Sequence, residues 1–241
     1  MNILKTLFYN KFNSWHKGLT KYRHKVFLSL FEGHGDKLLG LGCGDGGLTC
    51  NVGMKVGASD IKGIDLKDNI AQEYKNKIQL INCDLNSSIP ISSGSIDIVS
   101  GDQIIEHLYN TDLFVNEIHR ILRPGGYAVI CTENLASLHN LFALLLGKQA
   151  FSQFVSSKYK LGNSLTPHYK KPVKEGYFHV QIFTIEGLRD IFEFYNFEVE
   201  KLVGIIYFPF LPFWTGMIFE KIFPAHAQFI AVRVRKKASH E

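Results

Sequence analysis

A cluster of glycines near residue 40 is the clearest sign of chemistry in the sequence. Gly42, Gly44 and Gly46 alternate with other residues directly after a short apolar run, Lys37–Leu41. Glycine allows a backbone to turn sharply after a strand and to approach a ligand closely. A helix that follows such a turn directs its free N–H groups at an anionic group. The cluster therefore predicts a ligand-binding turn at the end of a first strand.

An acid follows the next apolar run and narrows the class of ligand. Asp65 lies at the tip of the predicted strand Ile61–Leu66, roughly twenty residues beyond the glycines. A carboxylate in that place can accept hydrogen bonds from two ribose hydroxyls, which indicates a nucleoside-containing cofactor. The glycine turn alone would predict much less, since it also occurs as a plain tight turn.

Two interpretations of the glycine cluster remain open at this point. Gly42, Gly44 and Gly47 also satisfy G-x-G-x-x-G, so a dinucleotide is an alternative to a mononucleoside cofactor. Asp45, inside the cluster, is expected to be an Asx-type turn residue without ligand contact.

Histidines supply the candidates for proton transfer. Glu106 and His107 follow a predicted fourth strand and face the expected substrate cavity. His107 is either a general base, able to take a proton from a hydroxyl, or a structural group at a helix start. His179, in a segment that returns to the sheet, is the second candidate, while His168 and Tyr169 are expected at the surface. No His or Cys spacing resembles a zinc site, so no metal is expected.

The elements that must position these residues alternate between strands and helices. Such alternation predicts βαβ units and a parallel sheet. Thr111 and Thr184 are expected to cap two helices, and the second of these precedes two final strands that alternate in polarity. Those last strands are expected to form an antiparallel pair at one edge of the sheet. The predicted strands are Lys37–Leu41, Ile61–Leu66, Ile78–Cys83, Ile96–Ser100, Tyr127–Thr132, Phe197–Glu200 and Phe229–Arg235.

The length of 241 residues suits one α/β domain. Residues 1–35 are expected to form N-terminal helices and residues 36–135 the cofactor-binding core. Residues 136–180, with the helix-like run Leu138–Leu146, break the strand–helix rhythm and predict an insertion that caps the substrate site. Residues 181–241 complete the sheet.

The composition is that of a globular protein, with 46% apolar and 20% charged residues. The net charge of +5 is spread along the chain without a long basic run, so a nucleic-acid partner is not expected. Four cysteines without a C-x-x-C pair, and an N-terminus unlike a signal peptide, favour a reduced cytoplasmic protein. The oligomeric state stays open.

An apolar stretch at residues 202–223 raises the question of a membrane. Two prolines and the pair Glu220-Lys221 argue against a spanning helix. Three interpretations remain: a buried connection, an aromatic wall of the substrate pocket, or a patch for peripheral contact with a membrane surface.

From residue 37 to about residue 135 the chain resembles the class I S-adenosylmethionine-dependent methyltransferase family, in its small-molecule type 11 branch. The blocks that carry the resemblance occur in the family's order and spacing, with a weaker echo in FHVQIFTIEGLRDIFEFYNFEVE. They read LLGLGCGDGG, GIDL, CDL, SIDIVSGDQIIEHL and EIHRILRPGGYAVICTE. The resemblance implies a Rossmann-like, doubly wound α/β fold with a seven-stranded sheet, mostly parallel with an antiparallel C-terminal strand.

The resemblance also implies roles for single residues toward S-adenosyl-L-methionine. The three alternating glycines would pass beneath its methionine part, and Asp65, with Leu66 beside it, would hold the ribose. The adenine would be bound at Asp84 and Leu85, and the methionine tail and the transferring methyl would be bordered by Asp102 and Gln103. The family usually has an acid, which helps to hold the cofactor's ammonium, where this chain has Gly40. Asp102 and Asp45 are two candidates to replace it.

The function expected from these observations is methylation of a small molecule, with the oxygen of a sugar or a lipid-linked acceptor preferred. Two alternatives remain. One is an NAD(P)-dependent oxidoreductase, which would use the G-x-G-x-x-G pattern but lacks a suitable Tyr-x-x-x-Lys pair. The other is a non-catalytic cofactor-binding protein of the same fold, because of the missing acid at Gly40.

Overall fold

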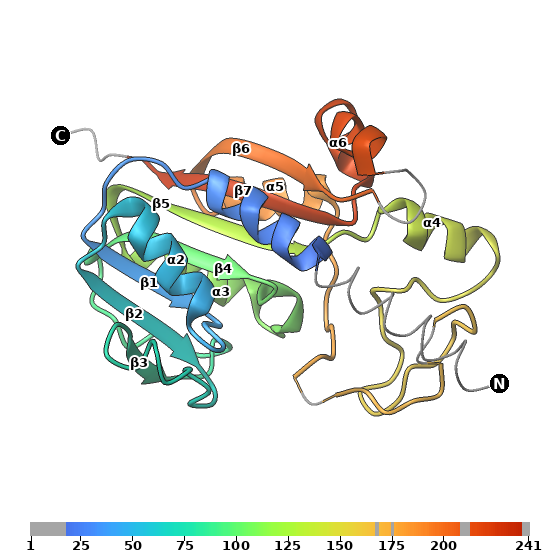
Figure 1. Cartoon of the computed structure of the whole chain (residues 1–241), viewed down its shortest axis with the longest axis horizontal. Coiled ribbons are helices and arrows are strands. Elements are labelled where there is room, and N and C mark those ends of the chain that lie inside the picture. Colours follow the sequence, from blue (N-terminus) through green and yellow to red (C-terminus); the bar gives the residue numbers. More distant parts are fainter. Residues whose placement is uncertain (1–17, 167–168, 175, 208–212, 238–241) are drawn as a thin grey trace.

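A computed structural model describes residues 18–166, 169–174, 176–207 and 213–237 of the chain (Figure 1). A seven-stranded sheet forms its centre, with the strand order β3-β2-β1-β4-β5-β7-β6. All neighbours pair in parallel except at β7, which runs antiparallel to both β5 and β6. The doubly wound, mostly parallel sheet with one antiparallel C-terminal strand is therefore confirmed.

The strands begin and end close to the predicted residues, except that the fifth begins at Leu122 instead of Tyr127 and the sixth is longer than predicted. Phe197–Glu200 was the expected strand, but pairing with β7 continues as far as Ile205. The first residues of the apolar stretch 202–223 therefore lie in the sheet. The strands are β1 (Lys37–Leu41), β2 (Asp60–Asp65), β3 (Gln79–Asn82), β4 (Ile96–Asp102), β5 (Leu122–Glu133), β6 (Phe197–Ile205) and β7 (Phe229–Lys236).

Helices cover both faces of the sheet because the strands are apolar on both sides. On one face, a helix at residues 18–29 and α2 (Gly47–Val56) pack Phe27 and Val52 against Leu38 and its neighbours. On the other face lie α3 (Thr111–Ile121) and α5 (Ile185–Phe194). Successive residues of one strand point to opposite faces, so Leu38 and Leu39 belong to different cores.

One of the two predicted helix caps is confirmed and the other is wrong. Thr184 caps α5 as predicted, since its hydroxyl accepts a hydrogen bond from the Gly187 N–H. The prediction for Thr111 is wrong by one residue. Asn110 caps α3, because its side-chain oxygen accepts a hydrogen bond from the Leu113 N–H. The short amide side chain competes well for this position.

Residues 136–180 leave the sheet after β5 and return before α5. They contain α4 (Leu138–Leu145) and an irregular segment that lies beyond the ends of the strands (Figure 1). The return is fixed by backbone pairing, with Leu135 N–H donating to the carbonyl of Phe183 at 2.9 Å. The insertion therefore lies on the side of the sheet toward which the parallel strands point.

Two further expectations concern the cysteines and the apolar stretch at residues 202–223. The four cysteines are free thiols in the structure, and three of them, Cys43, Cys50 and Cys131, are buried. Among the described residues, none of the helices has the length and apolarity needed to cross a bilayer. Residues 208–212 of the apolar stretch, residues 1–17 and His168 lie outside the described residues.

Candidate functional site

The glycine cluster forms a tight turn between β1 and α2. Gly42, Gly44 and Gly46 all have positive φ angles of 63°, 53° and 85°, which side chains rarely tolerate. A Cβ on Gly42 would lie 2.8 Å from the Ile104 side chain. The turn therefore brings bare backbone to the ends of β1 and β4. The order β2-β1-β4 makes this point a topological switch, where open α/β sheets bind ligands.

Asp65 fastens the end of β2 to this turn. One of its carboxylate oxygens accepts a hydrogen bond from the Gly44 N–H at 2.9 Å, and the other accepts one from the Lys67 N–H at 3.3 Å. The half-buried carboxylate therefore lies beside the glycine backbone, as its predicted ribose contact requires.

Gly40 lies within β1, where the side of the strand next to α2 is already filled. A Cβ at this position would meet the Thr49 hydroxyl oxygen at 2.4 Å and its methyl carbon at 2.7 Å. Thr49, on α2, thus occupies the space that an acid at residue 40 would need. The departure from the family pattern has a steric cause.

Asp45 and Asp102 were the two candidates to replace that acid. Asp45 behaves as the expected turn residue, since its oxygen accepts a hydrogen bond from the Gly47 N–H at 2.9 Å. Asp102, at the end of β4, is different. One oxygen pairs with Arg23 at 3.0 Å, while Oδ1 is buried and has no hydrogen-bond partner. A buried unpaired oxygen calls for a donor, so Asp102 is the better placed of the two.

Arg23 and His24 bring the N-terminal helix to this site. Arg23 is mostly buried and lies 4.8 Å from the ring centre of Phe229, and His24 Nε2 lies 3.4 Å from the Asp102 carboxylate. Sequence reasoning missed both residues. They precede the first strand and belong to none of the recognisable blocks.

A cavity of about 150 Å³ joins these groups. It lies between the N-terminal helix, the glycine turn and the end of β4. The lining comprises His24, Phe27, Leu41, Gly42, Cys43, Gly44, Asp45, Leu48, Thr49, Ser100 and Asp102. Free backbone, a hydroxyl and one carboxylate with an unused oxygen suit a ligand part that carries both a carboxylate and an ammonium. The donor set therefore fits the methionine end of S-adenosylmethionine.

The remaining predicted cofactor residues flank this cavity along the strand ends. Asp84 is exposed after β3 and accepts hydrogen bonds from Asn86. Leu66 is largely exposed, whereas Leu85 is buried in the core and leaves little surface for a ring. Gln103 has a positive φ of 56° and its N–H bonds the Cys131 carbonyl. Their contacts with adenine, ribose and methyl remain predictions.

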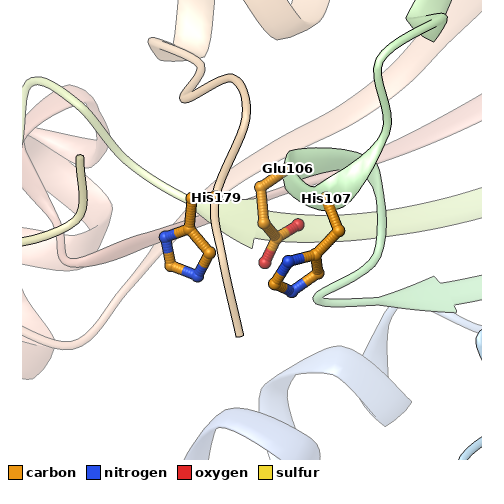
Figure 2. Close-up of side chains that lie close together, drawn as sticks. All are labelled: Glu106, His107 and His179. Carbon is orange, nitrogen blue, oxygen red and sulfur yellow. The ribbon is translucent and has the colours of Figure 1, made fainter. Parts of the chain in front are cut away.

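The predicted histidines meet each other. His107 lies in the 3-10 turn η1 (Ile105–His107), directly after β4, and its ring centre is 5.0 Å from that of His179. Figure 2 shows both rings and the Glu106 carboxylate directed toward one space. The insertion is tied to η1 here, because Val180 N–H donates to the Glu106 carbonyl at 2.7 Å.

Burial controls the charge of these groups. It lowers the pKa of His107 and lowers that of His179 to about 4, so both rings are neutral near pH 7. Burial also raises the pKa of the Glu106 carboxyl to about 8. The structure thus brings together two neutral imidazoles and a fully buried carboxyl group.

A larger cavity of about 330 Å³ lies at the other end of β4 and β5, near Asp97 and Tyr127. Its charged side chains pair with one another, as in Asp97 with Arg123 and Arg233 with Glu32. Asp97 also accepts a hydrogen bond from the Lys37 N–H at 2.9 Å, so it fastens β1 to β4. We therefore place the candidate site at the glycine turn.

Comparison with known proteins agrees with this geometry. Residues 39–130 match the family Methyltransf_11, described as a methyltransferase domain. Over this stretch the chain is similar to the class I S-adenosylmethionine-dependent methyltransferases. A domain of this kind implies S-adenosyl-L-methionine as the cofactor, which favours a methyltransferase over the oxidoreductase alternative. The match covers the glycine turn, Asp65, Asp102 and the histidine of η1, but neither Arg23 nor His179.

The individual relatives of this chain are distant. It is 28% identical over 190 residues to the mitochondrial ubiquinone biosynthesis O-methyltransferase of Rattus norvegicus, covering 75% of this chain and 49% of that protein. The chain thus spans about half the length of this curated relative. An S-adenosylmethionine-dependent methyltransferase of Methanosarcina mazei has the same fold, with a TM-score of 0.59, 15% identity and coverage of 89% and 98%. The [4+2]-cyclase SpnF also shares it, with a TM-score of 0.56, 14% identity and coverage of 90% and 80%.

Proposed function

We propose that this chain transfers a methyl group from S-adenosylmethionine to an oxygen atom of a small molecule, with a sugar or a lipid-linked hydroxyl compound as the acceptor. The observation that carries the proposal is the adjacency of two features. The backbone cavity suited to the methionine part lies at the end of β4, and the next turn, η1, presents His107 toward His179.

The bound cofactor supplies a methyl group that its sulfonium has already activated. The protein then has to hold the cofactor and align the acceptor oxygen with that methyl group. In this proposal the glycine turn receives the methionine carboxylate at the N-terminus of α2. Asp65 holds the ribose, Asp84 borders the adenine, and the unpartnered Oδ1 of Asp102 accepts a hydrogen bond from the ammonium.

Oxygen is favoured over nitrogen as the acceptor because a hydroxyl has a high pKa and benefits from a base. His107 Nδ1 and His179 Nδ1 both face backbone carbonyls, which leaves each Nε2 free to accept a proton. The printed name of the rat relative, an O-methyltransferase of ubiquinone biosynthesis, supports the same atom.

An amphiphilic acceptor is supported by α6 (Phe213–Ile222), which follows β6. Met217, Ile218, Phe219, Ile222 and Phe223 expose large apolar side chains. By contrast, Ile205, Ile206 and Tyr207 are buried, as expected for a connection. In the proposal the protein is cytoplasmic and touches the membrane surface through α6.

The test measures transfer of a labelled methyl group from the cofactor to a panel of catechols, sugars and prenylated phenols, with S-adenosylhomocysteine as the second product. His107→Ala and His179→Ala should lower turnover and leave the Kd of S-adenosylhomocysteine unchanged. Binding of this product without transfer to any oxygen acceptor would favour the non-catalytic alternative. Stabilisation by NAD and none by S-adenosylhomocysteine would favour the oxidoreductase.

A further inference from the structure

Three side chains outside the cofactor cavity converge on one point. Glu106 and His107 come from η1, and His179 comes from the segment that returns the insertion to the sheet. One potential ligand atom of each lies within 4.8 Å of the others. Figure 2 shows the carboxylate between the two imidazole rings. Small side-chain movements would bring two nitrogens and one carboxylate oxygen at such separations onto a single ion.

The histidine tautomers are set by the backbone. His107 Nδ1 lies 2.9 Å from the Phe178 carbonyl oxygen, and His179 Nδ1 lies 2.7 Å from that of Ser152. A carbonyl only accepts, so each Nδ1 carries the hydrogen and each Nε2 has a free lone pair. Metal-binding histidines are held in this way, by a hydrogen bond from the other ring nitrogen.

Glu106 supplies an independent observation. Its side chain has no solvent exposure. Oε2 accepts a hydrogen bond from the Thr132 hydroxyl at 2.8 Å, whereas Oε1 has no partner. The free lone pairs of the two imidazoles cannot donate to it. An ionised Glu106 beside two such acceptors would leave Oε1 without a cation or donor, and buried polar groups are rarely left unpaired.

We propose that Glu106, His107 and His179 bind one divalent transition-metal ion. Two imidazole nitrogens and one carboxylate suit zinc, iron, cobalt or manganese better than magnesium or calcium, which favour oxygen ligands. The same ligand set, with one position left open, occurs at catalytic zinc sites. The sequence did not predict this site, because His179 is far from Glu106 and His107 along the chain.

The bound ion would also take part in the reaction. This part of the inference rests on the proposed function. η1 begins three residues after Asp102, so an ion bound there would lie near the end of β4, where the proposed function places the methyl group. An ion there would bind the acceptor hydroxyl oxygen and lower its pKa. His107 and His179 would then act as ligands rather than as bases.

The experiment uses the full chain after treatment with a chelator and dialysis. Titration with CoCl2 is followed by visible absorption and by thermal unfolding. One equivalent of cobalt should produce a d–d band that ZnCl2 abolishes, and the Tm should rise because the ion binds the folded state. Glu106→Gln and His179→Ala should each weaken cobalt binding at least about tenfold. Loss of even a hydrogen-bond partner of a metal ligand typically weakens metal binding by that much.

His226→Gln is the matched control. The Nδ1 of His226 lies 2.9 Å from the Ala136 carbonyl oxygen, the same kind of contact, but His226 is not part of the cluster. Absence of a cobalt spectrum with the wild-type protein, or equal affinity in the two ligand variants and the wild type, would overturn the proposal. Circular dichroism and S-adenosylhomocysteine binding establish folding, and His107→Gln replaces any ligand variant that does not fold.

The two proposals fail separately. Methyl transfer that survives with no cobalt bound contradicts the metal site and leaves the O-methyltransferase proposal intact. Cobalt binding by the three ligands, with no transfer to any acceptor, contradicts the O-methyltransferase proposal and leaves the metal site intact.

Discussion

At the residue scale, the site could be predicted wherever one residue acts through its backbone or at a strand end. The glycines and Asp65 were recognisable because their positions follow from strand periodicity. Thr49 and Arg23 were not, since each acts through a neighbour that is distant in sequence. The convergence of Glu106 with two histidines likewise depends on how the insertion returns, which no local pattern encodes.

Asp65→Ala should weaken binding of S-adenosylhomocysteine by about 1–3 kcal/mol, because a charged hydrogen-bond acceptor is lost. Isothermal titration calorimetry measures the change. Asp60→Ala is the control, since Asp60 begins the same strand and pairs with Lys62. An unchanged Kd in the Asp65 variant would remove this residue from the cofactor site.

Gly40→Ala should lower the free energy of unfolding by about 1–3 kcal/mol, the usual cost of overpacking. Its methyl group would meet the Thr49 side chain. Adding Thr49→Ala removes that side chain, so the double variant should recover part of the loss. Urea unfolding of the four proteins in a double-mutant cycle measures this coupling. Strict additivity would show that Thr49 is not the reason for glycine at this position.

At the scale of elements, strands were easier to predict than their connections. Period-two and fully apolar runs located all seven strands, but β6 extends beyond its alternating part because β7 continues to pair with it. α3 shows how a helix fixes a loop. Its Glu117 carboxylate accepts hydrogen bonds from the Ile89 N–H at 2.6 Å and the Ser88 hydroxyl at 3.0 Å, and it pairs with Arg120.

Glu117→Gln should destabilise the protein at pH 7 by about 1–3 kcal/mol, because a buried charged acceptor is lost. Hydrogen bonding from Arg120 lowers the pKa of Glu117 from 4.5 to about 2. A carboxyl group whose pKa falls on folding stabilises above its unfolded value, so the difference from wild type should shrink as the pH falls from 4.5 toward 2. Urea unfolding at several pH values measures it.

Glu186→Gln is the control for that variant, since Glu186 forms a similar pair with Arg189 at the surface. Its effect should stay within about 0.5 kcal/mol at every pH. A pH-independent loss in Glu117→Gln would show that the charge of this residue is not what holds residues 88 and 89.

At the scale of the whole molecule, the doubly wound and mostly parallel sheet could be predicted, whereas the strand order and the surface could not. Apolar residues in 202–223 fitted three interpretations, because hydropathy does not reveal exposure. In the described part of this stretch, Ile205 to Tyr207 are buried, as in a connection, whereas the later part of α6 is exposed. Which side chains meet water depends on packing between elements far apart in sequence.

Ile218→Ser combined with Ile222→Ser should reduce binding to anionic phospholipid vesicles at least about tenfold. The two side chains lie one helical turn apart, and burial of each in lipid is worth more than about 1 kcal/mol. Co-sedimentation measures binding, with Met54→Ser on α2 as the control for an exposed apolar residue. Vesicle binding that is equal in all three proteins, or absent in the wild type, would contradict membrane contact through α6.

The position of β7 between β5 and β6 has a consequence for biosynthesis. β6 has no other partner in the sheet, so it cannot join until the segment Phe229–Lys236 has been made. A ribosome-bound chain that has emerged as far as α6 therefore carries the first five strands with an open edge at β5. Pulse-chase proteolysis of stalled chains should find residues 197–205 cleavable until the last strand emerges from the exit tunnel.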